Sequence, residues 1–210
     1  MKKIICALLL LWSQEGSAQQ PSVKVACVGN SITEGPGRNH PDSYPSQLQK
    51  ILGKDYQVTN FGVSARTLLK KGDFPYWNEP QFEQVQAFAP DILILLLGTN
   101  DSKPQNWAYK DSFLEDYVEM ISAIKRHMPE QGKIFLCLPV PVFDDNWGIT
   151  EKVIVEEMTP LIREAAKRTG AVVIDLHLPL EPHGRHFPDG VHPNKAGAKI
   201  MAQTLAKAIR

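Results

Sequence analysis

The sequence has no excess of charge of either sign. Its 210 residues include 23 Lys and Arg and 23 Asp and Glu, so the formal net charge at pH 7 is +0, and no block of like charge occurs. This balance argues against nucleic acid or an anionic membrane as a partner. Internal repeats, linkers and low-complexity tracts are also missing, so nothing in the sequence requires a second domain.

Long hydrophobic runs are missing too. The apolar run at residues 4–12 is too short to span a membrane, for which about 20 residues are needed. It follows two lysines and precedes the small residues Gly16, Ser17 and Ala18, a composition typical of a secretory signal peptide. We therefore expect residues 1–18 to be a signal peptide, and the mature protein to be periplasmic or extracellular without a stable membrane anchor.

Cysteine is scarce. Residues 19–210 fit a single domain that buries roughly 70% of its unfolded surface, and they contain only Cys27 and Cys137. An oxidising compartment would permit a bridge between the two. Both positions, however, fall in predicted strands that a doubly wound sheet does not place side by side. We expect two buried free thiols, with a disulfide as the alternative.

Predicted strands and helices alternate along the chain. Runs of β-forming or aliphatic residues predict five strands, near residues 23–28, 56–61, 92–97, 134–138 and 171–174. The continuous aliphatic run of the third is typical of a central strand covered on both faces. Helical patterns separate the strands, which indicates an α/β fold with a parallel sheet between helical layers, in a flavodoxin-like strand order.

Several helix ends carry local signals. Ser112 and Glu115 have the spacing of a capping box. Pro160 either kinks a helix of residues 151–168 or begins one. Asn194 is placed to cap the last helix of the chain.

Polar residues interrupt the chain where chemistry is expected in such a fold. Ser31 follows the first predicted strand, Gly62 the second and Asn100 the third, while Asp189 and His192 precede the last helix. Ligands of parallel α/β sheets bind outside the carboxyl ends of the strands. These residues supply a hydroxyl nucleophile, a base, a carboxylate and oxyanion donors, which is the set that acyl transfer needs.

Each residue of this set has an expected role. His192 would take the proton of Ser31 and return it to the leaving alcohol, and Asp189 would hold the other ring nitrogen. The backbone N–H groups of Ser31 and Gly62 and the side-chain amide of Asn100 would form the oxyanion hole. Each feature alone is more often structural. Their joint occurrence, in order, at successive strand ends favours a catalytic site.

Four sequence blocks carry a family resemblance. They are Gly-Asn-Ser-Ile-Thr at residues 29–33, Asn-Phe-Gly-Val-Ser at 60–64, Gly-Thr-Asn-Asp at 98–101 and Asp-Gly-Val-His-Pro at 189–193. In this order they resemble the SGNH hydrolases, the GDSL-type esterase superfamily, over the whole predicted domain. The resemblance implies a three-layer α/β/α sandwich with a five-stranded parallel sheet, and serine esterase chemistry without a cofactor or metal.

One position departs from the family pattern. Asn30 stands where the family usually has Asp, and since that acid is not the triad carboxylate, we expect fine tuning rather than activity to be affected. The spacing of Asp189 and His192 also occurs among metal ligands. No third ligand lies at a suitable spacing, so no metal site is predicted.

Large side chains in the loops after the strands are candidates for substrate binding. Trp77, Trp107 and Trp147 lie in loops that follow the second, third and fourth strands, and Arg66 accompanies them. Aromatic faces suit stacking on sugar rings, and an arginine suits a substrate carboxylate. Packing of these loops against the domain, and a merely solvated arginine, are the structural alternatives.

Secretion, the loop aromatics and the resemblance together favour one function. We expect a serine esterase that hydrolyses short-chain acetyl esters through an acyl-enzyme on Ser31, most simply O-acetyl groups of carbohydrates or sialates, with a small-molecule or glycan ester as its partner. One alternative is a lysophospholipase or thioesterase that acts on longer acyl chains. The other is a non-catalytic carbohydrate-binding domain that keeps the fold. The sequence does not predict the oligomeric state.

Overall fold

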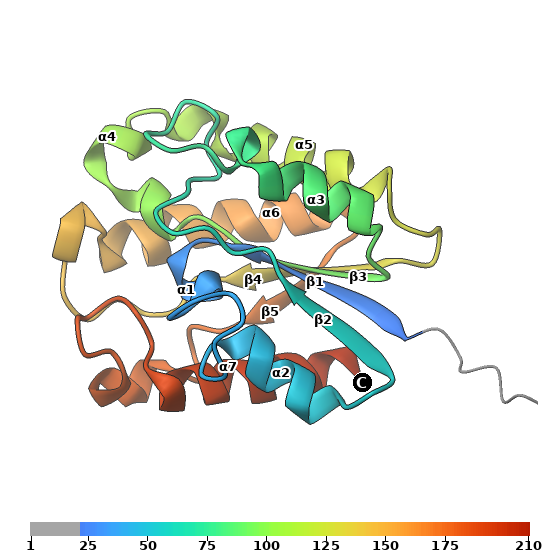
Figure 1. Cartoon of the computed structure of the whole chain (residues 1–210). Coiled ribbons are helices and arrows are strands. Elements are labelled where there is room, and N and C mark those ends of the chain that lie inside the picture. Colours follow the sequence, from blue (N-terminus) through green and yellow to red (C-terminus); the bar gives the residue numbers. More distant parts are fainter. Residues whose placement is uncertain (1–21) are drawn as a thin grey trace, which may run out of the picture.

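The computed structural model describes residues 22–210, so the expected signal peptide lies outside the described residues. A five-stranded parallel sheet lies between two layers of helices, and its strand order is β2-β1-β3-β4-β5 (Figure 1). This is the predicted α/β/α sandwich with the predicted flavodoxin-like order. The strands are β1 (Val23–Gly29), β2 (Tyr56–Asn60), β3 (Ile92–Leu96), β4 (Lys133–Leu138) and β5 (Val172–Asp175).

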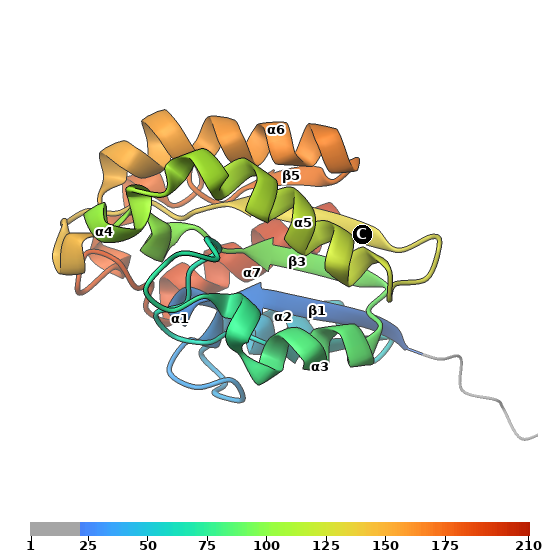
Figure 2. The same ribbon diagram turned by 90° about the horizontal axis from the view of Figure 1, so that it is seen from above.

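Five longer helices form the two outer layers. Helices α2 and α7 cover one face of the sheet, and α3, α5 and α6 cover the other (Figures 1 and 2). Two short helices, α1 and α4, lie at the carboxyl ends of the strands. The helices are α1 (Ser31–Glu34), α2 (Tyr44–Leu52), α3 (Pro80–Phe88), α4 (Pro104–Trp107), α5 (Phe113–Lys125), α6 (Thr159–Thr169) and α7 (Lys195–Ile209).

Strand β3 shows why the sheet needs a helical layer on each side. Its five residues are all buried, and successive side chains point to opposite faces. Leu93 and Leu95 join the core beneath α3, α5 and α6, whereas Ile92, Ile94 and Leu96 join the core beneath α2 and α7. The continuous aliphatic run is therefore buried on both faces, as predicted.

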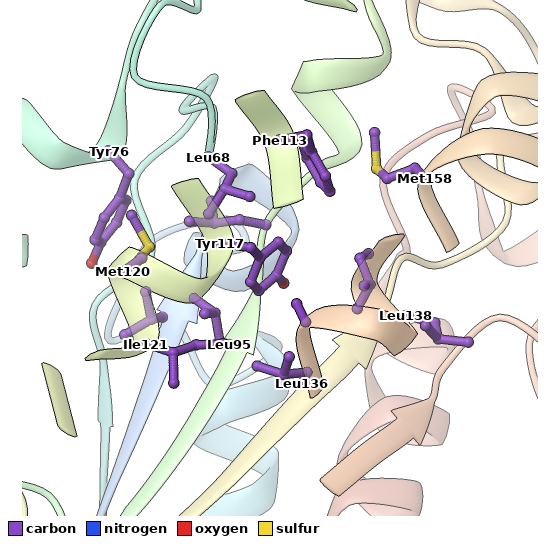
Figure 3. Packing of buried hydrophobic residues seen from close by; sticks show 14 of the residues in the cluster. Leu68, Tyr76, Leu95, Phe113, Tyr117, Met120, Ile121, Leu136, Leu138 and Met158 are labelled. Carbon is purple, nitrogen blue, oxygen red and sulfur yellow. The ribbon is translucent and has the colours of Figure 1, made fainter. Parts of the chain in front are cut away.

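The larger of the two cores contains most of the buried aromatic side chains. Figure 3 shows Tyr117 and Ile121 of α5 packed against Leu95 of β3 and Leu136 of β4, with Tyr76 from the loop after β2 at the side. This packing fixes α5 on the sheet. It also holds the polypeptide between β2 and α3 close to the carboxyl ends of the strands.

The helix ends agree only in part with the sequence signals. Asn194 caps α7, with its side chain accepting from two backbone N–H groups. The predicted capping box is wrong, because Ser112 has helical dihedrals and makes no capping bond, and Glu115 pairs with Arg168 at 2.6 Å instead. Helical backbone runs from residue 151 to 169, as α-helix at 151–152, π-helix at Val153–Met158 and then α6. Pro160 therefore lies within the predicted helix, directly after its π-helical part.

The two cysteines are buried and free, as predicted. Cys27 lies on β1 and Cys137 on β4, and β3 separates these strands. Burial raises the pKa of the Cys27 thiol to about 12 and raises that of Cys137 as well. Both thiols therefore stay protonated and unreactive at neutral pH. Within residues 22–210, no helix combines the length and hydropathy of a membrane span.

Candidate active site

Ser31 is the first residue of α1, at the carboxyl end of β1. The Asn30 side chain caps this helix by accepting from the N–H of Ile32 at 3.0 Å. A Cβ on Gly29 would lie 2.1 Å from the Thr33 hydroxyl and 2.6 Å from the Leu96 carbonyl oxygen. The strand can turn sharply into α1 only because a glycine stands there, and this turn presents the Ser31 hydroxyl at the edge of the sheet.

The structure joins Ser31, His192 and Asp189 by hydrogen bonds. Ser31 Oγ lies 2.8 Å from His192 Nε2, and His192 Nδ1 lies 2.8 Å from Asp189 Oδ2. A proton on Nδ1 donates to the carboxylate and leaves Nε2 free to accept from the serine hydroxyl. The arrangement can therefore transfer the hydroxyl proton to the imidazole.

Asp189 is held in place by its own turn. Its Oδ1 accepts from the N–H groups of Val191 and His192 at 2.9 and 2.7 Å. Partial burial acts to raise the pKa of Asp189, but these two N–H groups and the imidazole outweigh it and keep the pKa below its usual value. The carboxylate therefore remains charged at neutral pH and fixes the orientation of the ring.

Two of the three expected oxyanion donors belong to residues that line one cavity. They are the backbone N–H of Ser31 and the side-chain amide of Asn100. Asn100 follows β3 in a 3₁₀ turn, and one amide hydrogen of its side chain donates to the Arg66 carbonyl at 3.1 Å, which leaves the other available. No acceptor in the described chain pairs with the backbone N–H of Ser31.

The third expected donor, Gly62, is misplaced. Its backbone N–H already donates to the Asn60 side chain at 2.9 Å, and Gly62 does not line the cavity. Ala65 does line it, in a left-handed conformation with φ of 66°, and its N–H has no acceptor among residues 22–210. We therefore assign the second backbone donor to Ala65. The sequence could not have predicted this conformation, because alanine rarely adopts a positive φ and only its small side chain favours it here.

A buried carboxylate fixes the loop that carries Ala65. Asp101, next to Asn100, accepts from the N–H groups of Leu68 and Leu69 at 3.0 and 2.7 Å. Burial raises its pKa to about 7, against the lowering effect of these two hydrogen bonds. Asp101 thus ties the loop after β2 to the turn after β3, and sequence reasoning gave it no role of its own.

The cavity at the serine has a volume of about 560 Å³. It is open to a small molecule, and its lining combines the polar groups above with apolar side chains. Its lining residues are Ser31, Ile32, Gly35, Pro36, Ser64, Ala65, Asn100, Lys103, Trp147, Ile149, His192 and Pro193.

Only one of the candidate substrate-binding residues lies in this cavity. Trp147 is 60% exposed, and the centroid of its ring lies 5.5 Å from that of His192. Trp77 donates to the Leu68 carbonyl and packs on Phe82, and Trp107 is buried and donates to Glu157.

The Arg66 side chain also makes its contacts within the protein. Its Nε pairs with Glu79 at 2.6 Å, and the guanidinium also donates to the Ser64 carbonyl. For Trp77 and Trp107, the structure therefore agrees with the structural alternative, in which the loops pack against the domain. Arg66 is not merely solvated, as its alternative had it, because its guanidinium pairs within the protein. Among residues 22–210, no group of three or more His, Cys, Asp or Glu side chains is placed to hold a metal ion.

Sequence comparison relates the chain to known esterases. It is 45% identical over 211 aligned residues to an acetylxylan esterase of Xylanibacter ruminicola, covering 91% of this chain and 44% of that protein. It is 25% identical over 124 residues to a multidomain esterase of Ruminococcus flavefaciens, covering 58% and 16%. The chain thus spans less than half the length of either curated relative.

Comparison with solved structures supports the same fold. A carbohydrate acetylesterase from Sinorhizobium meliloti superposes with a TM-score of 0.71 at 19% identity, covering 90% of this chain and 98% of that one. An acetyl xylan esterase gives a TM-score of 0.71 at 19% identity, with 90% and 100% covered. The sequence model of the GDSL-like Lipase/Acylhydrolase family matches residues 27–200, from β1 into α7. The chain therefore belongs to the GDSL-like lipase/acylhydrolase family.

Proposed function

We propose that this protein is a serine esterase that removes acetyl groups from carbohydrates. The observation that carries the proposal is the unbroken hydrogen-bonded series Ser31–His192–Asp189 at the edge of a cavity that fits a small ester. The 45% identity to a protein named acetylxylan esterase supports an acetylated glycan as the substrate.

In the first half of the reaction, Ser31 Oγ attacks the acetyl carbon while His192 Nε2 takes its proton. The carbonyl oxygen becomes an oxyanion, which the N–H groups of Ser31 and Ala65 and the Asn100 amide stabilise. The intermediate then collapses, and the bond to the sugar oxygen breaks. His192 returns the proton to that oxygen, leaving acetyl-Ser31.

In the second half, His192 takes a proton from a water molecule that attacks acetyl-Ser31. The second tetrahedral intermediate collapses to acetate, and the proton returns to Ser31 Oγ. Trp147, exposed beside His192, is placed to stack on the sugar that carries the acetyl group. The composition of residues 1–18 supports a periplasmic or extracellular location for this activity.

The acyl-chain preference tests this proposal. Hydrolysis of p-nitrophenyl acetate, butyrate and octanoate by the protein should decrease with chain length, and acetylated xylan should release acetate. A preference for octanoate would instead support the lysophospholipase or thioesterase alternative, which the apolar side chains of Ile32 and Ile149 in the cavity would suit. Binding of xylan without any ester hydrolysis would support the non-catalytic alternative.

Replacing Asn100 by alanine should lower kcat by about 10²- to 10³-fold with little change in KM, because loss of one oxyanion donor weakens the transition state more than the ground state. Steady-state kinetics on p-nitrophenyl acetate measure both constants. Gln105→Ala, at an exposed position outside the cavity, is the control. A rise in KM alone would make Asn100 a substrate-binding residue instead.

A further inference from the structure

Lys103 is the one lysine or arginine among the residues that line the cavity at Ser31. It connects the 3₁₀ turn that carries Asn100 to α4, and it is partly buried. Its backbone carbonyl accepts from the N–H groups of Asn106 and Trp107, which fixes its position. Its side chain, however, plays no part in the proposed acyl transfer.

Within residues 22–210, the ammonium group of Lys103 makes neither an ion pair nor a hydrogen bond, whereas Arg38 and Arg66 are both paired. Arg38 donates to the Gly62 carbonyl and lies 3.7 Å from Glu34, and Arg66 pairs with Glu79. An ammonium group without a protein counter-charge can donate a charge-assisted hydrogen bond to an anionic group of a ligand.

The lining of the cavity contains no competing anion. No Asp or Glu is among its residues. Glu34 accepts from the N–H of Ser64 and pairs with Arg38, so it is already compensated. Asp144 and Asp145, on the loop before Trp147, are exposed and do not line the cavity. Among the residues that line the cavity, Lys103 is therefore the only Lys, Arg, Asp or Glu.

We propose that Lys103 binds an anionic group of the substrate and so selects acetylated glycans that carry a uronic acid close to the acetylated sugar. The inference rests on the proposed esterase activity and narrows its substrate class. A carboxylate on a neighbouring sugar suits a lysine, because the flexible stem and the compact charge of lysine tolerate a range of positions. Neutral acetylated glycans remain substrates with a lower kcat/KM.

The test compares two acetylated xylo-oligosaccharides that differ only in one uronic acid substituent. The measured quantity is the ratio of kcat/KM for the acidic and the neutral oligosaccharide, so that any general effect on catalysis cancels. The wild-type ratio should exceed one and fall at high salt. Lys103→Met should lower the ratio about tenfold, the effect of one charge-assisted hydrogen bond, and Lys103→Arg should retain most of it.

Lys152→Met is the matched control, since Lys152 is exposed and lies outside the cavity lining; its ratio should equal that of the wild type. A wild-type ratio of one, or an unchanged ratio in Lys103→Met, would overturn the role of Lys103. Turnover of p-nitrophenyl acetate shows whether the role of Lys103 alone is wrong or whether the protein is not an esterase. If that ester is hydrolysed while the ratio stays at one, the esterase proposal stands and the acidic substrate class does not.

Discussion

Alanine in place of Ser31 is expected to lower kcat for p-nitrophenyl acetate by about 10⁶-fold, the scale found when the nucleophile of a serine hydrolase is removed. Without Oγ no acyl-enzyme forms, and His192 Nε2 loses the group from which it takes a proton. The N–H groups of Ser31 and Ala65 and the Asn100 amide remain, so a small residual rate above the uncatalysed one should persist.

Ser122→Ala controls for the loss of a hydroxyl, because Ser122 lies on α5, is exposed and donates only to the Val118 carbonyl. Its kcat should match that of the wild type. Thermal unfolding should be similar for both variants. A rate within tenfold of the wild type in Ser31→Ala would contradict nucleophilic catalysis by this serine.

The fold could be predicted because its determinants are local. The burial of 92–97 on both faces, the cap at Asn194 and the alternation of strands with helices all follow from short sequence patterns. Ser31, Asn100, Asp189 and His192 could be proposed together for a related reason. Each lies at the carboxyl edge of the sheet, where the parallel topology forces neighbouring segments to meet.

The wrong predictions concern residues whose contacts depend on the conformation of a loop. The N–H of Gly62 pairs with Asn60 because the chain turns directly after β2, and the left-handed turn at Ala65 then brings a different N–H to the cavity. Trp77 and Trp107 turn inward because Leu68 and Glu157 offer acceptors to their indole N–H groups. The two indole hydrogen bonds depend on tertiary packing, so no short sequence motif predicts them. The bond from Gly62 to Asn60 is local, but the sequence does not show that it removes this N–H from the cavity.

Asp189→Asn should lower kcat by about 10⁴-fold while leaving the fold intact. The asparagine oxygen can still accept from the N–H groups of Val191 and His192, so the turn should keep its conformation. The side-chain amide, however, then faces His192 Nδ1 as a donor. The ring must accept there and carry its proton on Nε2, where it donates to Ser31 Oγ and can no longer take the serine proton.

Control of the His192 tautomer by Asp189 differs in its measurable effects from mere stabilisation of the turn. Thermal unfolding should change little, and KM should stay near the wild-type value, while kcat carries the loss. Asn146→Ala removes a different contact of the same segment, the hydrogen bond from Asn146 to the Asp189 carbonyl, and keeps the carboxylate, so its kcat should fall far less. Because the pKa of Asp189 is held below its usual value, the wild-type carboxylate is ionised in these assays at neutral pH, which is the state that Asp189→Asn removes. A near-normal kcat in Asp189→Asn would remove this carboxylate from the mechanism.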